Sequence, residues 1–244
     1  MQLNTFSIAA RCPRTGMLGV AVSTAVPAVG ALCPHVRPGV GAITTQSWVN
    51  PYLGFEAISR LGAGAGAREV LDSVLAGDDA RNVRQLGIVD ARGGSASWSG
   101  ADCTPWFGHR TGPGYAIQGN MLTGPEVVAG METAFLGSEA SELAERLLLA
   151  LEAGQAVGGD KRGKQSAALL VYHEEDYPWV DLRVDEHRHP VPELRRIWTI
   201  FLQQVRPFLA GMPKRGQPAC AAPEAVTSLL LTPPPYRPGG GGSA

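Results

Sequence analysis

Thr5, close to the start of the chain, is the residue whose position best suits nucleophilic chemistry. It stands in residues 3–10, where apolar and polar side chains alternate as in a β-strand. Removal of the residues before it would give Thr5 both a hydroxyl group and a free α-amine. The pKa of an α-amine is about 7.7–8.0, so near neutral pH the amine could accept the hydroxyl proton. The alternative is that Thr5 is an ordinary β-branched strand residue.

Polar residues at the ends of predicted strands are the next candidates. Thr45, Gln46 and Ser47 lie at the end of the strand predicted over residues 40–46. Ligand-binding groups often gather at such a place, although polar strand ends are common in proteins. Asn120 follows another predicted strand, and it either ends that strand or contacts a ligand.

A charged, glycine-rich loop, residues 158–164, precedes a later strand. It contains Asp160 and Arg162, and it leads into Gln165 and Ser166. Loops of this kind usually face solvent, and Asp or Ser side chains in them often fix turns. Two interpretations stay open: a structural loop, or part of a binding site in which Arg162 and Gln165 contact the substrate.

An acidic and histidine-rich segment near residue 180 is a weaker candidate, for metal binding. Its side chains have no spacing that is diagnostic of a metal site, so a solvated hairpin is the better interpretation. We therefore predict neither a metal nor a cofactor. The residues concerned are His173, Glu174, Glu175, Asp176, Asp181, Asp185, His187 and His189.

The cysteines indicate a reducing environment. Cys12, Cys33, Cys103 and Cys220 are widely scattered and form neither a CxxC pair nor a zinc-type Cys/His spacing. Free thiols are typical of cytoplasmic proteins, and no secretory signal is visible, so a cytoplasmic location is expected. Cys33 has no paired histidine and is interpreted as an inert thiol.

Composition excludes several classes of protein. The net charge is −1, from 21 basic and 22 acidic residues, and no basic block is present, which argues against nucleic acid as a partner. No apolar run approaches the roughly 18 residues of a membrane span, so no membrane partner is expected. A hydrophobic content of 44% in 244 residues supports one domain with a substantial core, with or without a tail.

The order of the predicted elements indicates the fold class. Three strands are followed by two helices, about four strands, two helices, two strands and one helix. This order favours an α+β protein with two stacked, mainly antiparallel sheets and helices on both outer faces. We expect this domain over residues 1–211 and a disordered Pro/Gly-rich tail over residues 212–244. The residues predicted to be almost fully buried are Val20, Val22, Ile43, Ile88, Leu169 and Val171.

Short motifs run through most of the chain in a fixed order. They are TFSIAAR at residues 5–11, PAVGA at 27–31, GVGA at 39–42, RQLG at 84–87, QGN at 118–120, GGD at 158–160, RG at 162–163, QSAALLV at 165–171 and VDLRVD at 180–185. Together they resemble the DUF1028 family, an uncharacterised group thought to adopt the N-terminal-nucleophile (Ntn) hydrolase fold. The resemblance spans roughly residues 4–202 and implies a four-layer αββα sandwich.

The resemblance also implies an amidohydrolase that acts on an amide bond in a small molecule or a short peptide. Thr5, exposed by processing, would be the nucleophile and its α-amine the base. Asp160 and Ser166 resemble the pair that supports the amine in proteasome-like proteins, and Asn120 resembles the group that holds the oxyanion. A homo-oligomer is left open. Fold alone does not decide function.

The sequence departs from that pattern near Thr5. Residues 2–4 stand between Met1 and Thr5, and the large residue after Met1 should keep Met1 in place. Proteasome-like sites need a lysine on the third strand, whereas no lysine precedes Lys161, and Cys12 stands where the family usually has Asp. These departures favour the alternative function, a non-catalytic small-molecule-binding or assembly protein on the same scaffold.

Overall fold

Alternating segments near the N-terminus form the centre of a six-stranded antiparallel sheet. In the computed structural model, which describes residues 2–3, 5–218 and 221–231, the strand order of this sheet is β11-β10-β3-β2-β9-β8. The hairpin of β2 and β3, predicted from the sequence, lies in the middle. The strands are β2 Thr5–Arg11, β3 Leu18–Thr24, β8 Gly108–Gly112, β9 Tyr115–Gly119, β10 Ser166–Tyr172 and β11 Val180–Val184.

A second antiparallel sheet has five strands, in the order β1-β5-β6-β7, with β4 also paired to β5. Because β6 occupies one edge of β5, strands β1 and β4 share the other edge, β4 along residues 41–44 and β1 along residues 47–48. The strands are β1 Gln2–Leu3, β4 Pro34–Arg37, β5 Gly41–Trp48, β6 Arg84–Asp90 and β7 Ser95–Ser99.

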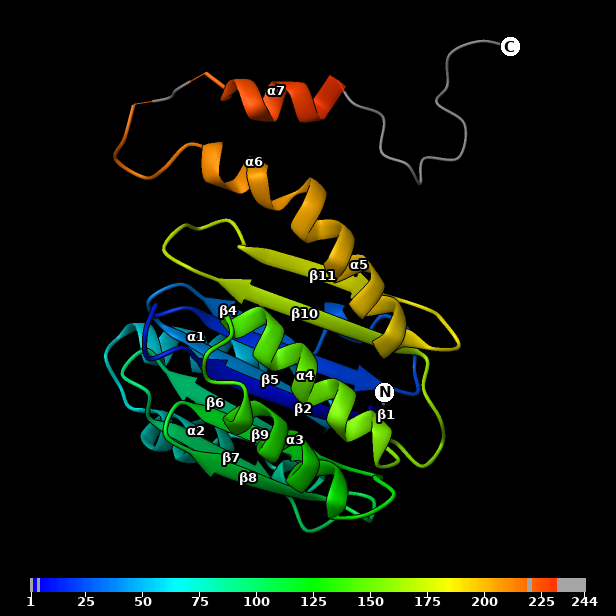
Figure 1. The fold of residues 1–244 in the computed structure, drawn as a ribbon. Helices are drawn as coiled ribbons and strands as arrows, with labels where there is room; N and C mark the ends of the chain where they lie inside the picture. The colour runs from blue at the N-terminus through cyan, green and yellow to red at the C-terminus, as the bar shows by residue number, and fades with distance from the viewer. Residues whose placement is uncertain (1, 4, 219–220, 232–244) are drawn as a thin grey trace. The chain divides into compact units, whose positions relative to one another are not determined.

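Helices cover the outer face of each sheet. α1 and α2 pack on the five-stranded sheet and α3 and α4 on the six-stranded sheet, while β2 and β9 contact β5 and β6 across the interior (Figure 1). The layers therefore confirm the predicted αββα sandwich. The helices are α1 Pro51–Gly62, α2 Ala67–Ala76, α3 Glu126–Gly137 and α4 Leu143–Ala156, with 3-10 turns η1 Val29–Ala31 and η2 Arg81–Val83.

Apolar residues fill one end of the space between the sheets. Ala9, Val20, Ala42 and Val89 belong to one buried cluster, although they come from strands of different sheets. On the other face of β5 and β6, Ile43 and Ile88 pack with residues of α1 and α2. The prediction of core residues is confirmed: Val20, Val22, Ile43, Ile88, Leu169 and Val171 are each 0% exposed.

The small residues of β3 allow α4 to approach closely. A Cβ atom on Gly19 would lie 2.9 Å from the Leu147 Cδ1 atom and 2.9 Å from the Leu170 carbonyl oxygen. Since Gly19, Ala21 and Ser23 share one face of the strand, this face holds the helix layer and the opposite face looks into the sandwich. The close packing expected from these small residues is therefore present.

Some elements differ from the sequence-based prediction. Strands β1 and β4 were not predicted, because β1 is only two residues long and β4 lies between Pro34 and Pro38. Pro34 is tolerated because it is the first residue of a strand that pairs on one side only. The last predicted helix, residues 192–209, is two helices, α5 Pro190–Gln204 and α6 Arg206–Gly211. Pro207 lies in the first turn of α6, where its missing amide N–H is tolerated but inside one continuous helix it would not be.

The chain divides into two compact units, Met1–Arg195 and Arg196–Ala244. In the first unit, Arg195 pairs with Glu145 and Glu152 of α4, at 2.7 Å each. The second unit contains α6 and a helix that was not predicted, α7 Glu224–Leu231. Residues 219–220 and 232–244 of the predicted disordered tail lie outside the described residues, and the domain boundary near residue 211 stays a prediction.

None of the helices in the described part of the chain has the length and hydropathy needed to cross a bilayer.

Replacing Val20 by Ala should lower the free energy of unfolding by about 1.5–3 kcal/mol, because a fully buried valine loses its methyl groups and leaves a cavity. Chemical denaturation measures this loss. The matched control is Val157→Ala at a side chain that is 47% exposed, which should change stability little. Equal effects of the two substitutions would contradict the inter-sheet core described above.

Candidate active site

Thr5 is the first residue of β2 and lies at the polar end of the space between the sheets. Its side chain is fully buried. Because side chains alternate along a strand, Thr5 shares a face with Ser7 and with Ala9 of the inter-sheet core. The strand therefore aims the Thr5 hydroxyl into the sandwich, not toward α3 and α4.

Uncharged groups hold Thr5 on every side that the structure describes. The Thr5 hydroxyl donates to Thr24 Oγ1 at 3.3 Å, and the backbone amide of Thr5 donates to the Asn120 carbonyl oxygen at 3.3 Å. In return the backbone N–H of Asn120 donates to the Thr5 carbonyl oxygen at 3.0 Å, and the side-chain Nε2 of Gln46 donates to the same oxygen at 3.1 Å. In the intact chain these contacts supply no general base.

A network of glutamine side chains surrounds this position. Gln46 Nε2 also donates to Gln85 Oε1 at 2.7 Å, and Ser7 Oγ donates to Gln46 Oε1 at 2.5 Å. Gln118 Nε2 donates to Ser7 Oγ at 2.6 Å and to Thr44 Oγ1 at 2.5 Å. These side chains are buried, so their amides depend on one another for hydrogen bonds. The network makes the site rigid without placing a charge in it.

Asn120 has one satisfied and one unsatisfied side-chain atom. Its Nδ2 donates to Gln85 Oε1 at 2.9 Å, whereas its Oδ1 is buried without a hydrogen-bond partner. A buried acceptor without a partner is costly, by about 1–3 kcal/mol. Asn120 Oδ1 is thus an acceptor without a donor, and the described bond of Nδ2 to Gln85 uses one of its two N–H groups.

Asp160 sits beside the end of β3. Its Oδ2 accepts from the Ala25 amide at 3.3 Å and pairs with Arg162 Nη2 at 3.0 Å, and its Oδ1 accepts from the Arg162 amide at 2.9 Å. A bridge between Asp160 and Leu122 brings the loop to the segment that follows Asn120. No described contact joins the carboxylate to Thr5.

Ser166 begins β10 and pairs with Thr24 of β3 in the sheet. Thr5 of β2 pairs with Thr24 from the opposite side of β3. The Ser166 hydroxyl donates to the Val26 carbonyl oxygen at 2.6 Å and accepts from the Val29 amide at 3.2 Å. These bonds fix the segment after β3. The fold thus brings Thr5, Asn120, Asp160 and Ser166 to one end of the sandwich. Of the other three residues, only Asn120 has a described hydrogen bond with Thr5.

The residues predicted to bind substrate have separate positions. Gln46 contacts Thr5, whereas Thr45 Oγ1 faces away and donates to the Asn50 carbonyl oxygen at 3.2 Å. Arg162 is occupied by Asp160, and its side chain is 35% exposed. The backbone N–H of Gln165 donates to the Thr24 carbonyl oxygen at 2.7 Å. Their roles in binding stay predictions.

Backbone strain concentrates around the same place. In the described residues, the non-glycine residues with positive φ are Ala28 at 57°, Ser47 at 67° and Met121 at 55°. Ser47 follows Gln46, Met121 follows Asn120, and Ala28 lies inside the segment that Ser166 fixes. Such conformations cost roughly 1–3 kcal/mol each and cluster at functional sites.

Sequence reasoning missed four residues of the site: Ser7, Thr24, Gln85 and Gln118. Each is a polar residue at a fully buried strand position. Polar residues at alternate positions of strands that are otherwise apolar were the signal that could have identified them.

Lys161 has no described contact with Thr5. Its Nζ atom donates to the Pro105 carbonyl oxygen at 2.6 Å. In the described part of the chain, no three His, Cys, Asp or Glu side chains form a group that could hold a metal ion.

Replacing Gln85 by Leu should destabilise the protein by about 1–3 kcal/mol for each buried amide that loses its partner, here those of Gln46 and Asn120. Denaturant unfolding measures the effect. Gln203→Leu, at an exposed position, is the matched control and should be close to neutral. If Gln85→Leu were as stable as the control, the described network would be wrong.

Cys33 should resist alkylation in the native protein. Burial raises the pKa of its thiol to about 12, against a weaker opposing effect of the Thr45 backbone bond. Because the pKa is raised, roughly one thiol in ten thousand is ionised at pH 8. Mass spectrometry after iodoacetamide treatment should find Cys33 labelled only after denaturation. Labelling of Cys33 in the native protein at the rate of an exposed thiol would contradict this.

Comparison with known proteins places these observations in a family. The model described as "Family of unknown function (DUF1028)" matches residues 5–194. A DUF1028 protein from Silicibacter pomeroyi, solved by crystallography, is similar at 30% identity and a TM-score of 0.79, over 86% of this chain and 95% of that one.

More distant similarity extends to Anbu, described as an ancestral beta-subunit. Anbu from Yersinia bercovieri gives 14% identity and a TM-score of 0.40 over 87% of this chain and 100% of that one. Anbu from Hyphomicrobium sp. strain MC1 gives 11% identity and a TM-score of 0.38 over the same shares, 87% and 100%. The curated proteins gave no match. Since the family model matches most of the sequence, the chain belongs to the DUF1028 family.

Proposed function

We propose that this protein is an Ntn-type amidohydrolase made as a precursor, in which loss of residues 1–4 turns Thr5 into the nucleophile. The observation that supports this most directly is the placement of Thr5, whose hydroxyl and nitrogen are both held at the buried start of β2. The match to the family model also begins at residue 5. The substrate class is a small-molecule amide or a short peptide.

In this scheme the nitrogen of Thr5 becomes an amine when residues 1–4 leave. The Thr5 hydroxyl oxygen attacks the carbonyl carbon of the substrate amide, and its proton passes to the α-amine. The C–N bond then breaks, the ammonium returns the proton to the leaving amine, and an ester remains on Thr5. Water hydrolyses the ester by the same proton transfers. Proton transfer of this kind contributes about 10²–10⁴-fold to the rate.

Asn120 has donor and acceptor groups for both parts of this scheme. Its Oδ1 is without a partner, so we assign it to the N–H groups of the amine. The described bond of its Nδ2 to Gln85 uses one of two N–H groups, so we assign the other to the oxyanion. Asp160 and Ser166 fix the segment that follows Thr24. They would act on Thr5 through Thr24, as positioning residues.

The second candidate is a non-catalytic binding or assembly protein, and β1 favours it. In the intact chain Gln2 and Leu3 form the strand β1, which pairs with Trp48 and Ser47 of β5. While the peptide bond before Thr5 is intact, the nitrogen of Thr5 is an amide that cannot accept a proton. The two candidates therefore differ in whether residues 1–4 are removed.

Intact-mass measurement, combined with assays on a panel of small amides and short peptides, tests the proposal. An active preparation should contain a species that begins at Thr5. Thr5→Ala should abolish both amide hydrolysis and any self-cleavage while the melting temperature stays close to that of the wild type. Thr5→Ser, which keeps a hydroxyl nucleophile, should retain activity.

Thr133→Ala is the matched control, since Thr133 is exposed on α3 and its hydroxyl donates only to the Ala129 carbonyl oxygen at 3.0 Å. It should leave both activity and processing unchanged. If the full-length chain hydrolyses amides and Thr5→Ala is harmless, the mechanism is wrong. If the chain stays full length and no amide is hydrolysed, the non-catalytic candidate is the better one.

A further inference from the structure

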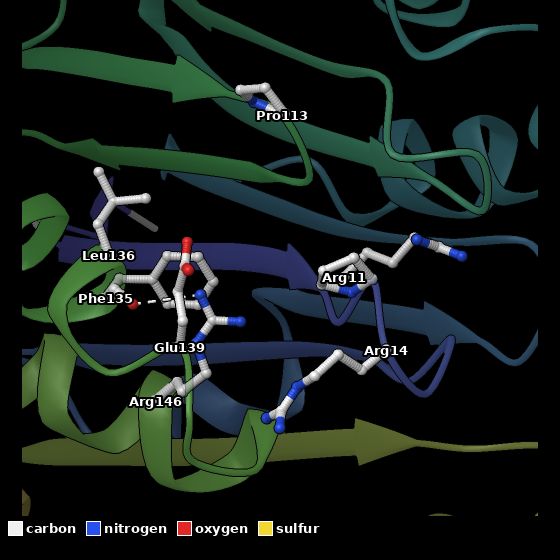
Figure 2. A pocket seen from close by; sticks show the side chains of 8 residues that line it. Arg11, Arg14, Pro113, Phe135, Leu136, Glu139 and Arg146 are labelled. Carbon is white, nitrogen blue, oxygen red and sulfur yellow. Dashed lines mark hydrogen bonds between the residues drawn. The ribbon is translucent and has the colours of Figure 1, made fainter.

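A cavity lined by three arginines lies at the end of β2 opposite Thr5. It has a volume of about 160 Å³ and is formed by the end of β2, the β8–β9 turn and the segment that joins α3 to α4. Figure 2 shows arginine side chains from different parts of the chain around it. The lining residues are Arg11, Pro13, Arg14, Pro113, Phe135, Leu136, Glu139 and Arg146.

Arg146 is a buried cation whose charge is not matched by a carboxylate. It is 4% exposed, its Nε atom is buried without a hydrogen-bond partner, and its Nη2 donates to the Phe135 carbonyl oxygen at 3.2 Å. The guanidinium carbon lies 4.0 Å from the centre of the Phe135 ring. The ring and one carbonyl compensate only part of the desolvation of a charged group. Consistent with this, burial lowers the pKa of Arg146.

Arg11 and Arg14 add positive charge around the cavity, while the negative charge of Glu139 opposes the lowering of the Arg146 pKa. Arg14 Nη2 donates to the Ser141 carbonyl oxygen at 2.6 Å, and no described ion pair involves Arg11, Arg14 or Arg146. Glu139 is the carboxylate on the lining, and it is exposed. In Figure 2 the second terminal nitrogen of Arg146 turns away from Phe135, toward the side where Arg11 and Arg14 lie.

Cys12 interacts electrostatically with Arg146 and opposes the lowering of its pKa. Burial tends to raise the pKa of the Cys12 thiol, but hydrogen bonds from Thr15 and Arg14 outweigh it and lower the pKa. A Cys12 thiolate would provide one negative charge against three guanidinium groups, and Cys12 is not among the residues that line the cavity. It cannot by itself neutralise the cavity.

We propose that this cavity binds a compact oxyanion, a carboxylate or phosphate group of a small ligand, through Arg146 with Arg11 and Arg14. A planar guanidinium presents paired N–H donors that match the oxygens of either group. Phe135 and Leu136 offer an apolar surface for the rest of the ligand. The ligand supplies a direct ion pair, which neither Glu139 nor Cys12 makes with Arg146 among the described contacts, although both act on it electrostatically.

Isothermal titration of the full-length protein with sodium phosphate, and separately with sodium benzoate, tests this binding, with sodium chloride at equal ionic strength as the baseline. We expect saturable binding of at least one of the two anions. Arg146→Met and Arg11→Gln should each weaken it by roughly tenfold or more, because a charge-assisted hydrogen bond is lost. Arg68→Met, at a side chain that is 76% exposed and pairs with Asp72, is the matched control and should bind as the wild type does.

The two probes distinguish the sources of the anion. Binding of phosphate alone indicates a phosphate-bearing ligand, binding of benzoate alone indicates a carboxylate, and binding of both supports the shared oxyanion chemistry. The melting temperature of Arg146→Met without added anion should equal or exceed that of the wild type, because an unmatched buried charge is removed.

Absence of binding beyond the chloride baseline would overturn the proposal. Unchanged anion affinity in both Arg146→Met and Arg11→Gln would overturn it too, since the arginines would then serve structure only. If Arg146→Met does not fold, Arg11→Gln decides the question, because Arg11 has no described side-chain hydrogen bond that its loss would break.

Discussion

Polar groups that are enclosed between two sheets must find partners there, and this requirement fixes the position of Thr5. Gln46 and Gln85 each bridge the two sheets, because they reach the Thr5 carbonyl oxygen and the Gly119 carbonyl oxygen from strands of the opposite sheet. Neither sheet could slide along the other without breaking these bonds. The same hydrogen bonds therefore set both the register between the sheets and the position of the Thr5 hydroxyl.

The absence of charge in this network has a chemical meaning. Asp160, a carboxylate that the fold brings to this end, is paired with Arg162 and accepts from the Ala25 amide after β3. A charge next to Thr5 would need its own buried partner, and the amides around it provide none. The structure thus separates the rigid neutral groups that hold Thr5 from the charged groups that hold the surrounding loops. The left-handed residues Ser47 and Met121 join these two parts.

Much of the fold could be predicted from the sequence because hydrophobic alternation reports burial directly. Alternation assigned Val20 to the core and a continuous apolar run assigned Leu169, while the paired helices between groups of strands implied the four layers. Strand β1 could not be predicted, because two residues carry no periodicity and their pairing depends on a distant partner, β5.

The site was harder to predict than the fold. Motifs pointed to Asn120, Asp160 and Ser166, and the fold brings them to the end of the sandwich where Thr5 lies. The hydrogen-bond partner of each could not be read from the sequence, because it depends on which neighbouring strand reaches the same level. Ser166 is the example: it bonds to Val26 and Val29, which its own strand does not reveal. Gln85 was missed because a polar residue in a strand reads as solvent-facing until the opposite sheet is known.

The shared edge of β5 has a consequence for the chain after processing. Strand β4 covers this edge only along residues 41–44, and β1 covers residues 47–48. Loss of the first residues would uncover the latter part of the edge, and uncovered edges invite pairing with other chains and aggregation. The uncovered stretch would be short, and the left-handed turn at Ser47 interrupts its extended geometry. After processing, residues 47–48 of β5 would be accessible at the end of the sandwich where Thr5 lies. The remaining cover by β4 would still limit pairing with other chains.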